Sequence, residues 1–580
     1  MQTSWAPLTV VGLLSGLLAV APSVMAQGAS EAKEPAPVGD FFEVVDVEIV
    51  NIDVWVTDKE GKPVEGLGKD DFVVYRDGRP TEVTNFYAVA GGRTVSGAAA
   101  DPLAPVDSTR GPLSRSPGDR AKVDPEHRLW LIVYVDNYNI DPNERNRVFP
   151  ALGKFLSLTL RDGDEAMIVT FDRSLEVRQP FTDEIGLLER SLAEIAGESG
   201  FAVVRKREQI DTLRRIDRTR DSRQALFYAR QYAEELMNGV QYTVDALERL
   251  IDTLGGLPGR KALVHVSSGV PMAAGEEMFH AVAEQFDTSE PYSEIPRHDS
   301  TRSFERVNRI ANAQRVTFYT LDAGGNRGME FGAAEYGAFA PKVRSMLDSV
   351  VPEMLQSPLR LMARETGGQA ILNQNEVLPA LQKASSDFRS FYSLGISSGD
   401  LVEGKYHEIE VKFGERRRGV KLRHRGGYRS KSADARVREN LRSVLLYSHE
   451  ENPLDLEVSW GRALPEGKKG EYLLPVRFHI PLRDVVLLPV GDGRHEVRLK
   501  LYVGAVGEDG ASSEIDAFPL SVRIPDASVE AAKGESLQHT HKLLLGRGRK
   551  RIGVAVFDEF GRESSVVVGT VQVGPPLADD

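Results

Sequence analysis

Hydrophobic and polar residues follow three different patterns along this chain of 580 residues. Residues 41–90 alternate with a period of two, most clearly in VEIVNIDVWVTD (47–58), which indicates half-buried β-strands. Between residues 128 and 398, short apolar runs alternate with segments of helical spacing, so this region predicts strands and helices in turn. From residue 454 to 575, about seven short alternating strands separated by turns predict a β-sandwich.

The apolar runs of the middle region have the composition of buried parallel strands. They are LWLIVYVD (129–136), EAMIVTFD (165–172), KALVHVSSG (261–269), RVTFYTLDA (315–323) and FYSLGISS (391–398). Strands of a parallel sheet are covered on both faces and therefore lack the polar alternation of a half-exposed strand. The βαβα order predicts an α/β fold with a doubly wound, mostly parallel sheet. A longer helical pattern at about 203–254 predicts an amphipathic helical region packed on that sheet.

These patterns, and the composition between them, divide the chain into seven segments. Residues 91–127 are rich in Gly, Pro, Ser and Arg and lose all periodicity, which is typical of a linker or a long loop. The predicted segments are a signal peptide (1–26), an N-terminal β unit (41–90), the linker or long loop (91–127), the α/β domain (128–398), a β extension (399–430), a charged connector (431–453) and the C-terminal β-sandwich (454–575).

The first residues predict export. The apolar run at 8–20 is too short to span a bilayer and is followed by Pro22 and by the small residues Val24 and Ala26, which favour cleavage after Ala26. An uncleaved anchor is the alternative interpretation. The chain has no cysteine, which excludes disulfides, thiolate metal sites and a cysteine nucleophile. An exported chain without disulfides suits a bacterial periplasm or the cell exterior.

The charge and the hydropathy pattern limit the classes of partner. The formal net charge is -13, which argues against a nucleic-acid binder. The basic runs at 214–220 and 414–425 are interpreted as solvated faces of a helix and of strands. No segment after the signal is long and apolar enough to predict stable membrane insertion. The expected partner is therefore an unidentified protein or a cell-surface polymer.

The element order, with Asp136 at the end of the first buried strand, resembles the von Willebrand factor type A fold. It is more closely similar to the bacterial group of exported VWFA-related domain proteins. Four passages carry the resemblance: NIDVWVTDKEGKPVEGLGKDDFVVYRDGRP (51–80), LWLIVYVDNYNIDPNERNRVF (129–149), EAMIVTFDRSLEVRQPFT (165–182), and FYSLGISSG with KYHEIEVKF and GVKLRHRGGY (391–428). The resemblance implies a type A-like domain that binds a partner through the loops at the carboxyl edge of its sheet.

The resemblance also implies where a metal would bind. The family's site takes an aspartate and two serines from D-x-S-x-S, a threonine from a later loop, and an aspartate from T-D-G. Here Asp136 is present, but Tyr138 and Ile140 stand at the serine positions, and the T-D-G position holds Ser267-Ser268-Gly269. Losing a carboxylate and both hydroxyls predicts a degenerate site without a cofactor.

A divalent ion such as Mg²⁺ remains the alternative. If one binds, the residues expected to hold it are Asp136, Thr243 and Ser268. Thr243 lies inside a helical pattern and is the best threonine candidate. Asn139 and Asp141 are also good turn or N-cap residues before the helix that follows, so Asp136 could instead accept hydrogen bonds within these loops.

Several polar side chains are predicted to gather at the carboxyl edge of the sheet, because parallel strands end there. We call them the binding edge: Asp136, Tyr138, Asn139, Asp172, Ser267, Ser268 and Asp322. Tyr138 and Phe171 would supply aromatic anchors for a partner.

Catalysis finds little support in the sequence. No H-E-x-x-H, G-x-S-x-G or phosphate-loop motif occurs. His265 is interpreted as a satisfied core histidine inside a strand, and no general base is evident for Ser268. The predicted function is a non-catalytic exported binding or adhesion module. The alternatives are an adhesion protein that depends on a divalent metal, and a hydrolase.

Overall fold

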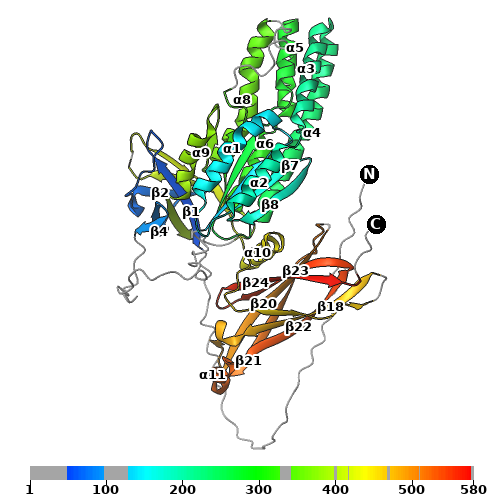
Figure 1. Ribbon diagram of the computed structural model, residues 1–580. Coiled ribbons are helices and arrows are strands. Elements are labelled where there is room, and N and C mark those ends of the chain that lie inside the picture. Colours follow the sequence, from blue (N-terminus) through cyan, green and yellow to red (C-terminus); the bar gives the residue numbers. More distant parts are fainter. Residues whose placement is uncertain are drawn as a thin grey trace, which may run out of the picture. The chain divides into compact units, whose positions relative to one another are not determined.

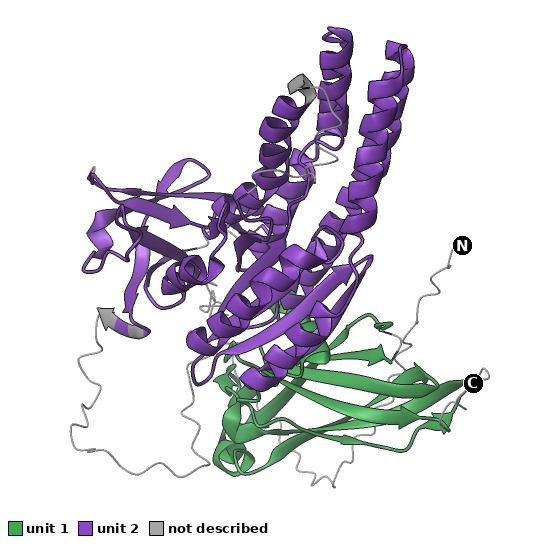
Figure 2. Cartoon of the chain, turned by 45° about the horizontal axis from the view of Figure 1, so that its top comes forward, with its two compact units in different colours: residues 1–48, 433–580 green, residues 49–432 purple. Residues whose placement is uncertain are grey.

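The computed structural model describes residues 49–96, 128–326, 341–397, 402–415, 417–466, 470–508 and 510–575 (Figure 1). The predicted signal peptide and residues 97–127 of the predicted linker lie outside this described part. The chain divides into two compact units, one of residues 49–432 and one that contains the described residues from Ala433 onward (Figure 2). No helix in the described part is long and apolar enough to cross a membrane.

A six-stranded sheet forms the centre of the larger unit, with strand order β11-β10-β9-β6-β7-β8. Its strands are β6 (Leu129–Val135), β7 (Glu165–Asp172), β8 (Ser174–Thr182), β9 (Arg260–Ser267), β10 (Val316–Asp322) and β11 (Gln369–Ile371). All neighbours are parallel except β8, which runs antiparallel to β7. The mostly parallel, doubly wound α/β sheet predicted from the sequence is therefore confirmed. The strand order reverses between β6 and β9, which is where such sheets bind ligands.

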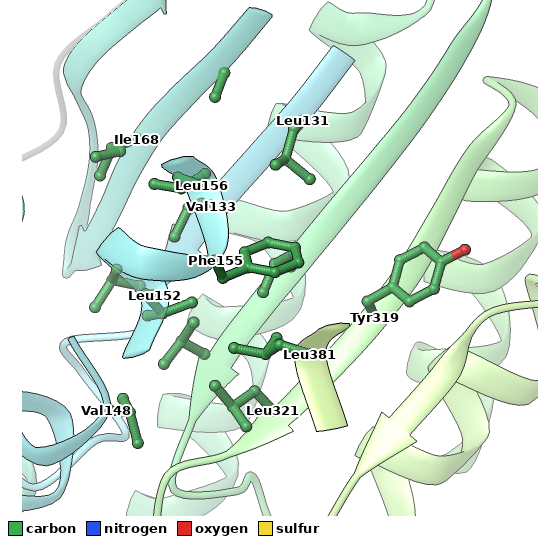
Figure 3. Close-up of a cluster of buried hydrophobic side chains, with 14 of the residues drawn as sticks. Leu131, Val133, Val148, Leu152, Phe155, Leu156, Ile168, Tyr319, Leu321 and Leu381 are labelled. Carbon is green, nitrogen blue, oxygen red and sulfur yellow. The ribbon is translucent and has the colours of Figure 1, made fainter. Parts of the chain in front are cut away.

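Helices cover both faces of this sheet. Leu152, Phe155 and Leu156 of α1 (Pro142–Thr159) pack on Leu131 and Val133 of β6 (Figure 3). Helices α2 (Ile185–Ala196) and α9 (Val377–Ser385) join the same cluster. Successive strand residues point to opposite faces, and Thr320 of β10 accordingly donates to the Leu359 carbonyl of α8 (Pro341–Glu365) at 2.9 Å. The remaining helix beside β10 is α6 (Thr301–Ala313).

A helical extension rises beyond the sheet (Figure 1). It consists of α3 (Ala202–Arg218), α5 (Glu276–Phe286) and the N-terminal halves of α8 and α4 (Ser222–Leu254). The amphipathic region predicted at 203–254 is thus two helices, and the second begins at Asp221, whose side chain accepts a hydrogen bond from the Arg223 amide at 3.0 Å. Apolar residues of all four helices form one buried cluster, so the extension has a core of its own.

The predicted N-terminal β unit and β extension combine into two antiparallel sheets, with strand orders β14-β1-β12-β4-β5 and β15-β13-β2-β3. The strands are β1 (Ile49–Thr57), β2 (Phe72–Arg76), β3 (Arg79–Thr81), β4 (Val83–Ala90), β5 (Arg93–Ser96), β12 (Phe391–Ser397), β13 (Tyr406–Phe413), β14 (Lys421–His424) and β15 (Gly427–Arg429). A shared apolar cluster fills the space between them.

The structure differs from the sequence prediction at two of these strands. The run 391–398 was expected to complete the α/β series, but β12 pairs antiparallel with β1 and β4, with Leu394 opposite both Ile52 and Phe86. A short run buried on both faces looks the same in a parallel and an antiparallel sheet, so its pattern cannot choose between them. The start of the predicted linker, Arg93–Ser96, is strand β5.

A buried carboxylate joins the five-stranded antiparallel sheet to the parallel sheet. Asp387, which is 1% exposed, accepts hydrogen bonds from both terminal nitrogens of Arg423, at 2.9 and 2.7 Å. It also accepts from Tyr319 Oη of β10 at 3.2 Å and from Gln369 Nε2 of β11 at 2.8 Å. Its main-chain carbonyl accepts from Trp55 Nε1 of β1 at 3.0 Å. One aspartate thus connects strands of both sheets.

The second unit is a β-sandwich covered by α10 (Ala433–Tyr447), which packs Leu441 and Leu445 on Tyr502 and Phe557. Its sheets have the orders β16-β18-β17, with β22 beside β18, and β19-β20-β23-β24, with β21 beside β20. The elements are β16 (Glu457–Trp460), β17 (Leu464–Pro465), β18 (Glu471–Pro481), β19 (Leu488–Pro489), β20 (Arg494–Gly507), β21 (Asp516–Pro525), α11 (Val529–Ala532), β22 (Ser536–Gly546), β23 (Gly548–Asp558) and β24 (Ser564–Val573).

We predict that Asp387→Ala destabilises the larger unit by about 3–5 kcal/mol, because it leaves the Arg423 guanidinium without its partner in the interior. Urea denaturation measures the free energy of unfolding. The double variant Asp387→Leu/Arg423→Met removes both charges and should cost less than the two single changes added together. Additive losses would contradict a direct coupling between these side chains.

Candidate functional site

The candidate site lies where the strand order reverses, at the carboxyl ends of β6 and β9. Asp136 follows β6 directly and is 0% exposed. Its main-chain amide donates to the Val266 carbonyl of β9 at 2.9 Å, which holds the residue between the two strands. Its Oδ2 accepts from Ser267 Oγ at 3.0 Å, and its Oδ1 accepts from the main-chain amide of Asn139 at 3.2 Å.

The side chain of Asn139 completes this arrangement. Its Nδ2 lies 3.0 and 2.9 Å from the two carboxylate oxygens of Asp136 and 2.9 Å from Thr243 Oγ1. Its Oδ1 accepts from the guanidinium of Arg205 on α3. A carboxylate only accepts and a guanidinium only donates, so this orientation of the amide is the one that its neighbours require. Arg205 and Asp136 thus bind opposite ends of the same amide group.

Tyr138 anchors the same loop beneath the helices. Its ring stacks on Phe201, with ring centroids 4.9 Å apart, and meets Phe171 at 5.8 Å. Burial raises its pKa, while the cations of Arg205 and Arg173 lower it. A Cβ at Gly239 of α4 would lie 2.9 Å from Tyr138 Oη, so glycine at this point of the helix makes room for the phenol.

The other predicted residues have separate partners. Asp322 is 1% exposed and accepts from Gln356 Nε2 of α8 at 2.7 Å and from the Gly324 amide at 2.9 Å. Ser268 donates to the carboxylate of Glu144 and accepts from the Asp141 amide at 3.3 Å. Asp141 is the N-cap of α1, as its residue type predicts, and accepts from the Asn143 amide at 2.9 Å.

Asp172 and His265 differ in their surroundings. Asp172 is exposed, at the end of β7. His265 is buried, as predicted, but neither ring nitrogen has a hydrogen-bond partner within the described residues, so it is not the satisfied core histidine that we expected. Its Nε2 lies 3.7 Å from Asp136 Oδ2.

Comparison with known proteins adds distant matches to solved structures. No family model and no curated protein matches the chain. An aerotolerance-related membrane protein from Bacteroides fragilis matches with 8% identity and a TM-score of 0.24, over 45% of this chain and 98% of that chain. Von Willebrand factor type A from Catenulispora acidiphila matches with 9% identity and a TM-score of 0.22, over 77% and 66%. The PilB minor pilin from Streptococcus sanguinis matches with 9% identity and a TM-score of 0.23, over 60% and 79%.

Three features identify the fold: the strand order of the sheet, its antiparallel edge strand β8, and the position of Asp136 where the strand order reverses. The parallel sheet and its helices have a von Willebrand factor type A-like fold. The likeness concerns the fold, and the site is judged from its own side chains.

The donor set of this type A-like domain does not fit a divalent ion at Asp136. An amide NH₂ group of Asn139 faces both carboxylate oxygens and Thr243 Oγ1, and a nitrogen that carries two protons is not a ligand for Mg²⁺. Thr243 does face the site, as its contact with Asn139 Nδ2 at 2.9 Å shows. Ser268, the third residue of the alternative metal set, is engaged with Glu144 instead. Among the described residues, no cluster of three His, Asp or Glu side chains could hold a metal.

The predicted binding edge needs a correction. Most of its side chains are inside the protein: Asp136 0%, Tyr138 7%, Asn139 2%, Ser267 0% and Asp322 1% exposed. The side chains of α3, α4 and α8 cover them, as the contacts of Arg205, Thr243 and Gln356 show. These residues therefore do not form a docking surface in this structure.

Sequence reasoning missed Arg205 entirely. It lies 66 residues after Asn139, in the region that had been predicted only as amphipathic helix. It also missed Arg145 of α1, which is 0% exposed and donates to Asn137 Oδ1 at 3.0 Å and to the Glu198 carbonyl at 2.7 Å. Burial lowers the pKa of Arg145, and the carboxylate of Glu198 raises it.

We predict that Asn139→Asp creates a dependence on divalent cations. The change replaces the NH₂ donor by a carboxylate beside Asp136 and the hydroxyls of Ser267 and Thr243, which is an oxygen-rich ligand set. Without a cation, the repulsion between like charges should lower the melting temperature. Mg²⁺ or Mn²⁺ at a hundredfold excess over its Kd should restore about 2.7 kcal/mol of stability.

Thermal melting and calorimetric titration with and without chelator measure this effect. Asn137→Asp is the matched control, because Asn137 is also buried but bonds to Arg145 and Glu198 rather than to Asp136. Saturable binding of Mg²⁺ to the natural chain, lost in Asp136→Ala, would contradict our interpretation of the site.

Proposed function

We propose that this protein is an exported, non-catalytic binding module that recognises a protein partner without a metal ion. The proposal rests on the side chain of Asn139. Its amide lies between Asp136 and Thr243 and bonds to both, so it fills the position that an ion would take in a type A-like site. A partner carboxylate cannot complete a metal site there. The hydroxyl of Ser268 donates to Glu144 and accepts from the Asp141 amide, and we assign it the structural role of holding the start of α1.

The contact surface that we propose is the distal tip of the helical extension. Phe201, at the start of α3, lies against Tyr138 at the sheet, so Arg218 at the other end of this 17-residue helix lies about 25 Å away. We define the tip by five exposed residues: Arg215, Arg218, Arg220, Arg223 and Phe227.

The composition of the tip is typical of an interface. Phe227 is 60% exposed, and its ring meets that of Tyr228 at 6.1 Å. The guanidinium of Arg215 lies over Tyr228, 6.0 Å from the ring centroid. Residues 214–223 contain five basic and two acidic side chains, although the whole protein has a net charge of -13. Aromatic residues and arginines are enriched where proteins bind each other, so the partner we propose is an acidic protein surface.

We predict that Phe227→Ala combined with Arg218→Glu weakens binding to the partner at least tenfold, which corresponds to about 1.4 kcal/mol. Stability should change by less than about 0.5 kcal/mol, because both side chains are exposed. A photo-reactive residue at position 227 should give one discrete protein adduct on the surface of the producing cells, with or without a chelator.

Tyr242 provides the matched control for this experiment. It lies on the same helix and is 55% exposed, but it is outside the tip. A photo-reactive residue there should give no adduct. Equal adducts at both positions, or an adduct at 227 that requires a divalent cation, would reject the proposal.

A further inference from the structure

A cavity lies in the larger unit, away from both Asp136 and the tip. It has a volume of about 1080 Å³ and is lined by α6, the C-terminal part of α8, β11, β13 and β14. Helix α6 contributes Asn308 and Asn312, which are one turn apart and so share a face of the helix. The opposite wall carries Tyr406 and Glu408 of β13.

Asn308 is the unusual residue of this cavity. It is 3% exposed, yet neither its Oδ1 nor its Nδ2 has a hydrogen-bond partner within the described part of the chain. A buried amide without partners costs free energy, so such a group calls for a functional explanation. Asn312 is different: its Nδ2 donates to the Glu365 carbonyl at 3.1 Å and to Tyr406 Oη at 3.2 Å, and only its Oδ1 lacks a partner.

The cavity also contains the free edge of a sheet. Strand β11 is the last strand of the parallel sheet and pairs only with β10 among the described strands. Gly368 and Ala370, at this strand, line the cavity. Arg423 of β14 donates to the Gly367 and Gly368 carbonyls at 3.0 and 3.2 Å. These bonds hold the two residues that precede β11 in place. An edge strand offers main-chain donors and acceptors to an added strand.

We propose that this cavity binds an extended peptide segment, whose main chain pairs with the edge of β11 and whose amide groups are recognised by Asn308. An Asn side chain carries one acceptor and an NH₂ donor, which match the N–H and C=O of a peptide bond. Addition of a strand to an edge supplies affinity through the main chain, while the cavity around the peptide selects its side chains.

The charges of the cavity agree with a polypeptide rather than with a purely anionic ligand. Arg309 and Arg364 lie on the helical wall, and Glu408 and Glu410 lie on β13. Arg364 is paired with Glu365 at 2.9 Å, and Glu410 with Lys412 at 2.8 Å. The two walls therefore present both signs of charge to an occupant, as an extended segment with mixed side chains requires.

The test is a selection of linear peptides from a displayed library on the full chain, followed by binding measurements with the variant Asn308→Leu. The change keeps the size of the side chain but removes both polar groups. We expect peptide affinity to fall at least tenfold and the melting temperature to rise by about 2 °C or more, because the unpaired buried amide is gone. A merely structural Asn308 would give the opposite change in melting temperature.

Two further measurements complete the test. Asn312→Leu should lower the melting temperature, because it removes the hydrogen bonds to Glu365 and Tyr406. In hydrogen exchange, the bound peptide should protect the amides of residues 369–371, and unchanged exchange there would reject pairing with β11. Failure to select any peptide, or equal peptide binding by Asn308→Leu, would overturn the proposal, as would a saccharide that binds the natural chain and not the variant. The tip variant Phe227→Ala should bind the peptide normally, so this result is independent of the proposed partner of the tip.

Discussion

A carboxylate that is removed from water must be surrounded by hydrogen-bond donors, and the larger unit depends on this constraint at two places. Asp136 is satisfied by Ser267, by the main chain and by the side chain of Asn139, and these bonds tie β6, β9 and α4 together. Asp387 is satisfied by groups from β10, β11 and β14. The first aspartate fixes the carboxyl edge of the parallel sheet, and the second attaches the five-stranded antiparallel sheet to it.

The hydrogen bonds of the Asn139 side chain explain how a type A-like fold can keep Asp136 without the ion that the resemblance implies. In a metal site, a cation would neutralise the carboxylate and connect it to a threonine. Here the Asn139 amide makes both connections, and its Oδ1 accepts a hydrogen bond from Arg205. Arg205 belongs to α3, so these hydrogen bonds join the helical extension to the carboxyl edge of the parallel sheet.

Local sequence patterns predicted most of the fold but not the side-chain contacts of the candidate site. The apolar runs that became β6, β7, β9 and β10 were predicted correctly, because burial on both faces leaves a continuous hydrophobic signal. The N-cap role of Asp141 was also visible from its residue type. The pairing of β12 and the approach of Arg205 to Asn139 depend on contacts between distant parts of the chain, which no short window of sequence contains.

The continuity of α4 has a mechanical consequence. This helix has 33 residues and a length of about 50 Å, and it contains no proline at which it could bend. Its first turns lie in the tip, and Thr243 is about 30 Å further along its axis. A sideways force on the tip is therefore transmitted along α4 to the turn that contains Thr243, which contacts Asn139. Gly239 is the one glycine of this helix and the point at which we expect it to bend. The ring of Tyr138 packs directly against it.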